Sequence, residues 1–346
     1  MKQKHAGCPA WVADGHRIVY FAAGTPYVAN PDTTAIRKPS AAEQKHVRLA
    51  QDSGQTWSKY GKFLDVDLNW QVVRILTLHG TAATFRWSDD YSLVWSPDRR
   101  KLAFVRMQKT EQIFILDTVG RRSHRLAAGT NPAWSPDGSW IAFESKNHVL
   151  VVPVRGGAAR QIGKGRHPVW SPDSRLVAAT GGGVFVMSRD GEPRRRIDRR
   201  AGEICGGGAE RPNERPAWSH DGRMLAFAYW CEADQADELA VVGSDGTFPR
   251  VVAQGNSPQW SRDDTQIAFI DPSGHLAYVP AAGGSGRVLD TRNVKSFSLT
   301  ADGRLVAYSV DIPSKVGTEI WVVQTDGTKR RPLLQGGSDS EPAWRP

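Results

Sequence analysis

The chain has 346 residues and a formal net charge of +9, and hydrophobic residues make up 40% of it. No apolar stretch approaches the roughly eighteen residues that a membrane span needs, and the N-terminus lacks the apolar core of a secretory signal. This excludes a helical membrane protein, and we expect either a protein that works where it is made or a mature piece whose leader lies outside this sequence.

One segment, PAWSPDG followed by IAF, recurs in recognisable form along the chain. At the position of its tryptophan stand Trp11, Trp57, Trp95, Trp134, Trp170, Trp218, Trp260 and Leu299, and Trp344 belongs to a last partial copy. A period of roughly forty residues, with several strand-like runs in each unit, is typical of a radial array of small sheets. One such unit cannot bury its own apolar face and must pack against its neighbours.

The first two units are the least regular. The segment TWSKYGKFLDV keeps the Trp-Ser pair, the turn and the apolar run around Trp57. The unit from Trp11 has a long polar stretch, residues 32–45, where its outer strands should be. We therefore expect its sheet to be less regular than the later ones.

The unit that begins at Pro132 shows the pattern most clearly. A short strand meets a Ser-Pro-Asp-Gly turn, in which proline presets φ and Asp137 accepts local backbone N–H bonds. Two nearly continuous apolar runs follow, residues 140–143 and 149–154, as expected for strands buried on both faces. After a Gly-Gly turn, residues 160–162 alternate in a way that suits an edge strand. The aspartates at this turn position are Asp98, Asp137, Asp173, Asp221 and Asp302.

These patterns predict an all-β propeller of four-stranded antiparallel blades, with eight blades or, alternatively, seven. We expect one domain over residues 1–346. Its blades should begin near residues 9, 55, 93, 132, 168, 216, 258 and 297, and residues 341–346 should add one more inner-type strand beside the first blade.

Propeller topology divides the connections between two sides. Turns between strands one and two, and between three and four, open on one side, here the turn side; the other connections open on the loop side. Basic residues cluster on the turn side at 99–101, 121–125, 194–196 and 329–331. These clusters are either a positive surface or charges that keep sheet edges from pairing with other chains. They lack interleaved aromatic residues and a continuous groove, which argues against a nucleic-acid partner.

The loop side is predicted to be the acidic and working side. Its connections around residues 198–215, 231–238 and 311–318 are longer than a blade needs, and extra loop length on a rigid scaffold often carries recognition, although insertions can also be inert. The candidate binding residues there are Glu203, Arg215, Glu232, Asp234, Asp237 and Asp311. A second set should ring the mouth of the central channel and hold a small anion, an extended peptide end or only water: Asn131, His167, Arg215 and Ser257.

Three cysteines give one candidate pairing. Topology places Cys205 and Cys231 on the same side of one blade, so a disulfide is geometrically plausible, with two free thiols as the alternative. It would close a loop of about 25 residues, stabilise the fold by ~3 kcal/mol and imply an oxidising compartment. We expect Cys8 to stay unpaired.

Catalytic motifs are absent from the sequence. The segment GGSGR fails the nucleophile-elbow pattern, and there is no HExxH, CxxC or P-loop. His148, His167 and His275 would all lie on the loop side but in different blades, which favours lone surface histidines over a metal site. We expect a protein that is not an enzyme and holds no cofactor and no metal.

The repeat resembles the blades of the TolB family of β-propellers: WSPDG followed by IAF, then a third strand such as IWVVQTDG or LAVVGSDG. The resemblance covers nearly the whole chain, without the small α/β domain that precedes the TolB propeller and without a signal peptide. It implies a monomeric, periplasmic, non-catalytic scaffold that binds a protein or an envelope polymer through its loop side. The alternatives are a cytoplasmic location, and the propeller of a metal-dependent polysaccharide lyase or of a prolyl-oligopeptidase-type peptidase.

Overall fold

The computed structural model of the chain describes the strands between Ala10 and Arg86 and residues 90–98, 100–107, 109–117, 122–191, 194–198, 209–210, 215–300, 302–311 and 318–337. Within these residues the secondary structure consists of strands and turns, with no helix, so none of them forms a membrane-spanning helix. The all-β prediction is confirmed. The predicted strand at 341–346 lies outside the described residues.

The N-terminal part forms two antiparallel four-stranded sheets. The first contains β1 (Ala10–Trp11), β2 (Ile18–Ala22), β3 (Thr25–Ala29) and β4 (Ile36–Arg37). The second contains β5 (Gly54–Ser58), β6 (Lys62–Asp67), β7 (Val72–Thr77) and β8 (Ala83–Arg86). Both follow the inner-to-outer strand order that the repeat predicts.

Six further sheets follow, which we name blades A to F. Blade A contains β9 (Asp90–Trp95), β10 (Lys101–Met107), β11 (Glu111–Asp117) and β12 (Arg122–Ala128). Blade B contains β13 (Thr130–Trp134), β14 (Trp140–Ser145), β15 (His148–Pro153) and β16 (Arg160–Lys164). Blade C contains β17 (Arg166–Trp170), β18 (Leu176–Thr180), β19 (Val184–Ser188) and β20 (Arg194–Arg196).

Blade D contains β21 (Ala209–Glu210), β22 (Ala217–Trp218), β23 (Met224–Cys231), β24 (Ala236–Gly243) and β25 (Arg250–Gln254). Both β21 and β22 pair with β23, so the inner strand of this blade is interrupted. Blade E contains β26 (Asn256–Trp260), β27 (Gln266–Ile270), β28 (Leu276–Pro280) and β29 (Arg287–Asp290). Blade F contains β30 (Val294–Leu299), β31 (Leu305–Asp311), β32 (Thr318–Gln324) and β33 (Arg331–Gly337).

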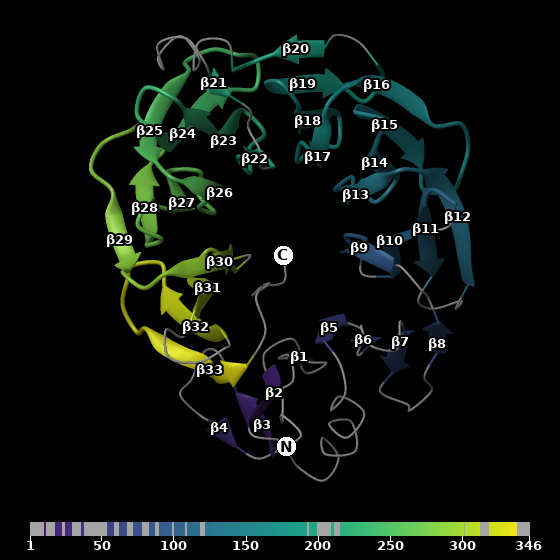
Figure 1. Ribbon diagram of the computed structural model, residues 1–346, viewed down its shortest axis with the longest axis horizontal. Helices are drawn as coiled ribbons and strands as arrows, with labels where there is room; N and C mark the ends of the chain where they lie inside the picture. Colours follow the sequence, from purple (N-terminus) through teal and green to yellow (C-terminus); the bar gives the residue numbers. More distant parts are fainter. Residues whose placement is uncertain are drawn as a thin grey trace.

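Figure 1 shows the sheets arranged around a central opening, with the first strand of each sheet innermost except in blade D, where β22 lies nearest the opening. The propeller prediction is therefore confirmed. The number of blades that close the ring, eight or seven, stays a prediction.

The turn after each inner strand is held by its own side chains. In blades A to F the hydroxyl two residues before the turn aspartate donates to that carboxylate at 2.5–2.7 Å. The same carboxylate accepts a backbone N–H two residues further on, as Asp221 does from Arg223 at 2.9 Å. These bonds from Arg223 and from the Ser219 hydroxyl lower the pKa of Asp221.

The core lies between neighbouring blades. The cluster with Ile113 and Ile115 of blade A, for example, also contains Ile141 and Val152 of blade B. The repeat tryptophan joins the same interface, because its indole N–H donates to a backbone carbonyl of the preceding blade. Trp134, Trp170, Trp218 and Trp260 donate in this way to Val94, Ala133, Val169 and Ala217, at 2.9, 3.0, 3.3 and 2.9 Å. The side chains of Trp11 and Trp57 lie outside the described residues.

Arginines on the turn side also link one blade to the next. An arginine in the outer strand of each of blades B to E donates to a backbone carbonyl in the following blade. The donor and acceptor pairs are Arg160 to Arg189 (2.5 Å), Arg195 to Asp245 (2.6 Å), Arg250 to Ala281 (2.8 Å) and Arg287 to Asp326 (3.3 Å). Part of the positive charge predicted for this side therefore serves blade-to-blade contacts.

Candidate binding face at the channel mouth

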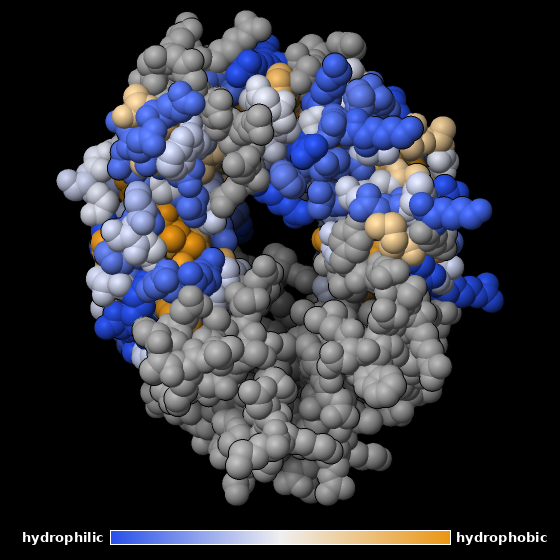
Figure 2. Space-filling model, in the orientation of Figure 1, coloured by the Kyte–Doolittle hydropathy of each residue, from blue (hydrophilic) through white to orange (hydrophobic). Residues whose placement is uncertain are grey.

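The inner strands bulge at the loop-side mouth of the channel. In blades A, B, C and E, Ser92, Asn131, His167 and Ser257 have φ values of 55, 49, 52 and 56°. The pairing of the inner with the second strand shifts register at the same positions. A bulge redirects a side chain, and positive φ in residues other than glycine is uncommon and clusters at functional sites. Figure 2 shows hydrophilic residues bordering the opening.

A glycine before the bulge permits this geometry. A Cβ on Gly129 would lie 2.4 Å from the carbonyl oxygen of Glu144, and one on Gly255 would lie 2.3 Å from that of Ile270. Both glycines also have positive φ. The segments GTNPAW and GNSPQW therefore need glycine because the inner strand approaches the second strand too closely for any side chain.

Glu144, near the end of β14, is the centre of the mouth. Its Oε2 accepts a 2.9 Å hydrogen bond from Asn131 Nδ2 and a 3.4 Å contact from the backbone N of His167. Its Oε1 lies 3.6 Å from Arg166 Nε, and only 14% of its side chain is exposed. One carboxylate thus ties together the bulges of blades B and C.

His167 lies in surroundings that disfavour its charged form. Its burial lowers its pKa below the usual value, Glu144 opposes this, and the positive charges of Arg215 and Arg166 add to it. Its Nδ1 lies 3.3 Å from the hydroxyl of Thr180.

Arg215, just before β22, brings blade D into the same cluster. Solvent reaches its side chain, but the surrounding protein hinders hydration of the guanidinium and so lowers its pKa. The negative charge of Glu144 acts in the opposite direction and raises this pKa. Three of the four predicted mouth residues therefore interact around Glu144, and Ser257 occupies the corresponding position in blade E.

The hairpin of blade D projects beyond its neighbours on the loop side. Strands β23 and β24 have 8 residues each, whereas β18, β19, β27 and β28 have 5. The tip exposes Glu232 and Asp234. At its base Asp237 is half-buried and accepts a 3.4 Å contact from Asn256 Nδ2, and its cross-strand partner Trp230 is 38% exposed.

The other acidic residues of the loop side are not exposed in the way that the hairpin tip is, or lie outside the described residues. Glu238 is buried, and this burial, together with the neighbouring Asp234, raises the pKa of its carboxyl. Asp311 ends β31, but its side chain lies outside the described residues, as does Glu203 entirely.

Cys231, at the end of β23, is disulfide-bonded, and the other two cysteines, Cys8 and Cys205, lie outside the described residues. Its sulfur approaches Asp234 Oδ2 to 3.4 Å. A disulfide sulfur has no hydrogen, so this is a van der Waals contact. Cys231, Asp234 and Glu238 have potential ligand atoms within 4.8 Å of one another, but a disulfide sulfur is not the thiolate that a metal requires.

The three loop-side histidines are engaged separately. The Nδ1 of His148 contacts the carbonyl oxygen of Lys146 at 2.9 Å, and that of His275 contacts Asp271 at 3.1 Å. Among the described residues no two of these histidines belong to one group of metal-type ligands.

Sequence reasoning missed Glu144 and Trp230. Glu144 directly follows the apolar IAF run, so its position at the strand end was a signal for a mouth residue. Trp230 stands outside the tryptophan repeat, immediately before Cys231 and an acidic stretch, which marked it as a non-repeat aromatic residue.

Comparisons with known proteins support the fold. No family model matches the chain, and no curated protein matches its sequence. Among solved structures, TolB from Acinetobacter baumannii is 16% identical with a TM-score of 0.49, over 95% of this chain and 79% of that one. Oligogalacturonate lyase from Vibrio parahaemolyticus is 13% identical with a TM-score of 0.53, over 75% and 85%.

The β-propeller domain of Cps50 (Swd1) from Myceliophteria thermophila is 11% identical with a TM-score of 0.53, over 76% of this chain and 93% of that one. At these identities the likeness concerns the fold alone, because one fold hosts many functions.

Proposed function

We propose that the protein is a non-catalytic propeller that binds another protein through its loop side. The observation that carries this proposal is the projecting hairpin of blade D, which presents Glu232, Asp234 and the half-exposed Trp230 beside the polar channel mouth. Aromatic side chains with charged neighbours are typical of interaction surfaces, and a rigid scaffold holds them in place.

The difference between the two sides supports this choice of face. On the turn side, arginines donate to backbone groups of the next blade. On the loop side, the hairpin tip extends beyond both neighbouring blades. A partner that approaches the loop side therefore meets the exposed carboxylates of the hairpin tip first.

We further propose a periplasmic or other extracytoplasmic location and a monomeric state. The disulfide at Cys231 supports the location, because disulfides persist in oxidising compartments and are rare where thiols are kept reduced. A cell-envelope polymer is the alternative partner on the same face.

The experiment is a charge reversal on the hairpin tip. Wild-type protein, a Glu232→Lys/Asp234→Lys variant and a turn-side control, Asp190→Lys/Asp326→Lys, are immobilised and used to capture partners from the envelope fraction of the source cells. The control makes the same charge change at two exposed turn carboxylates. For any protein that the wild type and the control retain, we expect the hairpin variant to bind about tenfold more weakly, because rim charges assist association and removing two costs on the order of 1 kcal/mol. Equal affinities for all three proteins would reject the loop-side surface.

A further inference from the structure

The last three blades depart from the repeat at the turn-side ends of their inner strands. The turn proline of blades A to C, at Pro97, Pro136 and Pro172, is replaced by His220, Arg262 and Ala301 in blades D to F. The repeat tryptophan is replaced by Leu299 in blade F, and the fourth turn residue, a glycine in blades B, D and F and Arg99 or Ser174 in A and C, is Asp264 in blade E. Places where a repeat breaks its own rule are where function is expected, because the packing role is given up there.

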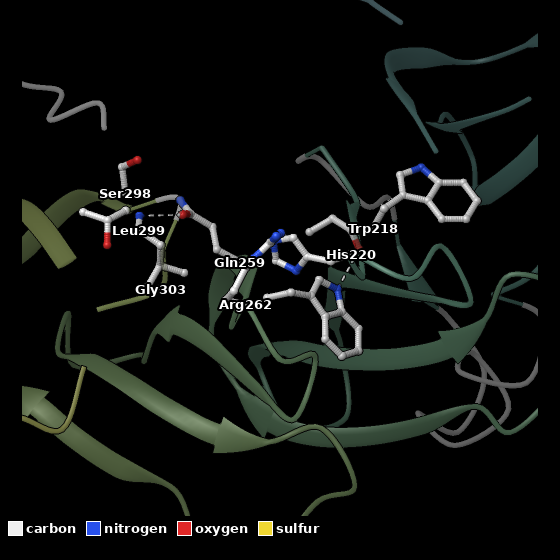
Figure 3. A pocket seen from close by; sticks show the side chains of 10 residues that line it. Trp218, His220, Gln259, Arg262, Ser298, Leu299 and Gly303 are labelled. Carbon is white, nitrogen blue, oxygen red and sulfur yellow. Dashed lines mark hydrogen bonds between the residues drawn. The ribbon is translucent and has the colours of Figure 1, made fainter. Parts of the chain in front are cut away.

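These departures surround one pocket. A cavity of about 350 Å³ is lined by Trp218, His220, Trp260, Arg262 and Leu299, together with Ala217, Gln259, Ser298, Thr300 and Gly303. Figure 3 shows the side chains of His220, Gln259, Arg262 and Leu299 toward this space, whereas the indole of Trp218 points away from them. The volume falls within the range of small-molecule sites. The pocket lies on the side of the ring opposite the hairpin tip, because it follows the inner strands to their turn-side ends.

The replaced proline and glycine form a polar joint between blades D and E. In the joint between blades C and D, the Pro172 ring packs beside Gly222, 3.5 Å from where a Cβ would stand. In the joint between D and E, His220 Nδ1 instead contacts Asp264 Oδ1 at 2.8 Å. Asp264 also accepts the backbone N–H of His220, at 2.7 Å. The imidazole is thereby oriented by its Nδ1, and its Nε2 is the nitrogen left for a ligand.

Arg262 supplies the charge of the pocket. Its side chain is exposed, and none of the described residues forms a hydrogen bond or ion pair with its guanidinium. An arginine fork matches a carboxylate in two parallel hydrogen bonds. An apolar surface beside this charge is formed by Leu299 and by the edge of the Trp260 indole, which is 5% exposed, whereas the Trp218 indole packs against blade C and donates to Val169.

We propose that this pocket binds a small organic anion that carries a carboxylate on an aromatic ring. The carboxylate pairs with Arg262 and lies near His220, and the ring lies against Leu299 and the exposed edge of Trp260. This site is separate from the loop-side surface and does not depend on it.

The test uses a matched pair of ligands, indole-3-acetate and its uncharged amide, titrated into the full chain by isothermal calorimetry. We expect saturable binding of the acid and about tenfold weaker binding of the amide, since a charge-assisted pair is lost. In Arg262→Gln the affinity for the acid should fall to that for the amide, while the amide is unaffected. Arg175→Gln, which removes the same charge from the exposed turn of blade C, should behave as the wild type.

A second variant tests the location. Gln259→Ala/Leu299→Trp places an indole on the pocket wall and should abolish binding of both ligands, and circular dichroism checks that the variant folds. The hairpin variant Glu232→Lys/Asp234→Lys should bind the acid like the wild type. Absence of saturable binding to the wild type, equal affinities for acid and amide, or an Arg262→Gln variant indistinguishable from Arg175→Gln would each overturn the proposal.

Discussion

A single buried carboxylate shows how much one residue contributes to this ring. Asp290 ends β29, its side chain is fully inaccessible, and it contacts Arg292 Nη2 at 2.5 Å, Arg330 Nη1 at 3.4 Å and the hydroxyl of Tyr308. Burial alone would raise its pKa, but the hydrogen bonds from Arg292 and Tyr308 lower the pKa to about 2. The carboxylate is therefore charged in the folded protein at neutral pH and fixes blade F against blade E.

Asp290→Asn should lower the free energy of unfolding at pH 7 by about 3 kcal/mol, because it leaves two arginines without their buried partner. The folded-state pKa of about 2 lies below the ordinary value of 3.8, so the ionised carboxylate stabilises the fold above pH ~4, and this stabilisation is lost as the pH falls through 2. Urea unfolding from pH 7 to 2 should therefore show the wild type approaching the variant at low pH.

Asp190→Asn is the control for this prediction, because Asp190 is 75% exposed and pairs with arginines at the surface. It should cost less than about 1 kcal/mol. If wild type and Asp290→Asn lose stability in parallel on acidification, Asp290 is not the titrating group.

At the scale of elements, each joint between blades repeats one pair of residues. The residue directly before each repeat tryptophan packs against the repeat tryptophan of the next blade. Ala133 of blade B and Trp170 of blade C form such a pair. Between blades E and F the pair is changed at both ends, to Gln259 and Leu299. The Gln259 amide donates to the carbonyl of Phe297 at 2.9 Å and accepts the backbone N–H of Leu299 at 3.2 Å, replacing the missing indole bond.

This pairing predicts strong coupling in a double-mutant cycle. Gln259→Ala should cost about 2 kcal/mol through two lost hydrogen bonds, and Leu299→Trp about 2 kcal/mol through overpacking against Gln259. The double variant rebuilds the standard joint and should be more stable than the sum of the singles by about 2 kcal/mol. Urea denaturation of the four proteins measures this.

Gln259→Ala combined with Arg175→Gln is the uncoupled comparison, since Arg175 lies in blade C, and its effects should add within ~0.5 kcal/mol. If the unfolding free-energy changes of Gln259→Ala and Leu299→Trp also simply add, Gln259 does not substitute for the indole.

At the scale of the whole molecule, the ring separates two kinds of surface. Its turn side is joined by local turn bonds and arginine contacts between blades, whereas its loop side has polar bulges and a projecting hairpin. Strand β23 of the hairpin ends at Cys231, whose disulfide ties the hairpin to another part of the chain. The redox state of the compartment therefore influences the proposed binding face.

Non-reducing peptide mapping should recover a peptide that links Cys205 to Cys231 and an alkylated peptide that contains Cys8. Reduction should lower the free energy of unfolding by ~3 kcal/mol, because it releases a loop of about 25 residues. Cys8→Ser should leave the melting temperature unchanged, and Cys205→Ser should expose the Cys231 thiol to alkylation. A Cys8–Cys231 peptide would contradict the predicted pairing.

Much of the fold could be predicted because its signals are local. The hydroxyl and carboxylate of each Trp-Ser-Pro-Asp turn bond within five residues of chain, so the turn is readable from a short segment. Three predicted mouth residues, Asn131, His167 and Arg215, could be grouped on one side because propeller topology assigns every loop to a side, and their role in binding stays a prediction. The central Glu144 could not, because its role depends on bonds to two blades at once.

The sequence by itself determined the β-architecture, the four-strand unit and the turn chemistry of this protein, because these depend on period, alternation and contacts between near neighbours. Tertiary structure alone decided which distant groups meet. His220 and Asp264, or Asp290 and Arg330, are about forty residues apart and lie in different blades or strands. Their pairing depends on how one blade sits against the next, and so does the pocket that His220 lines together with Arg262 and Leu299. A one-dimensional pattern carries no record of that packing.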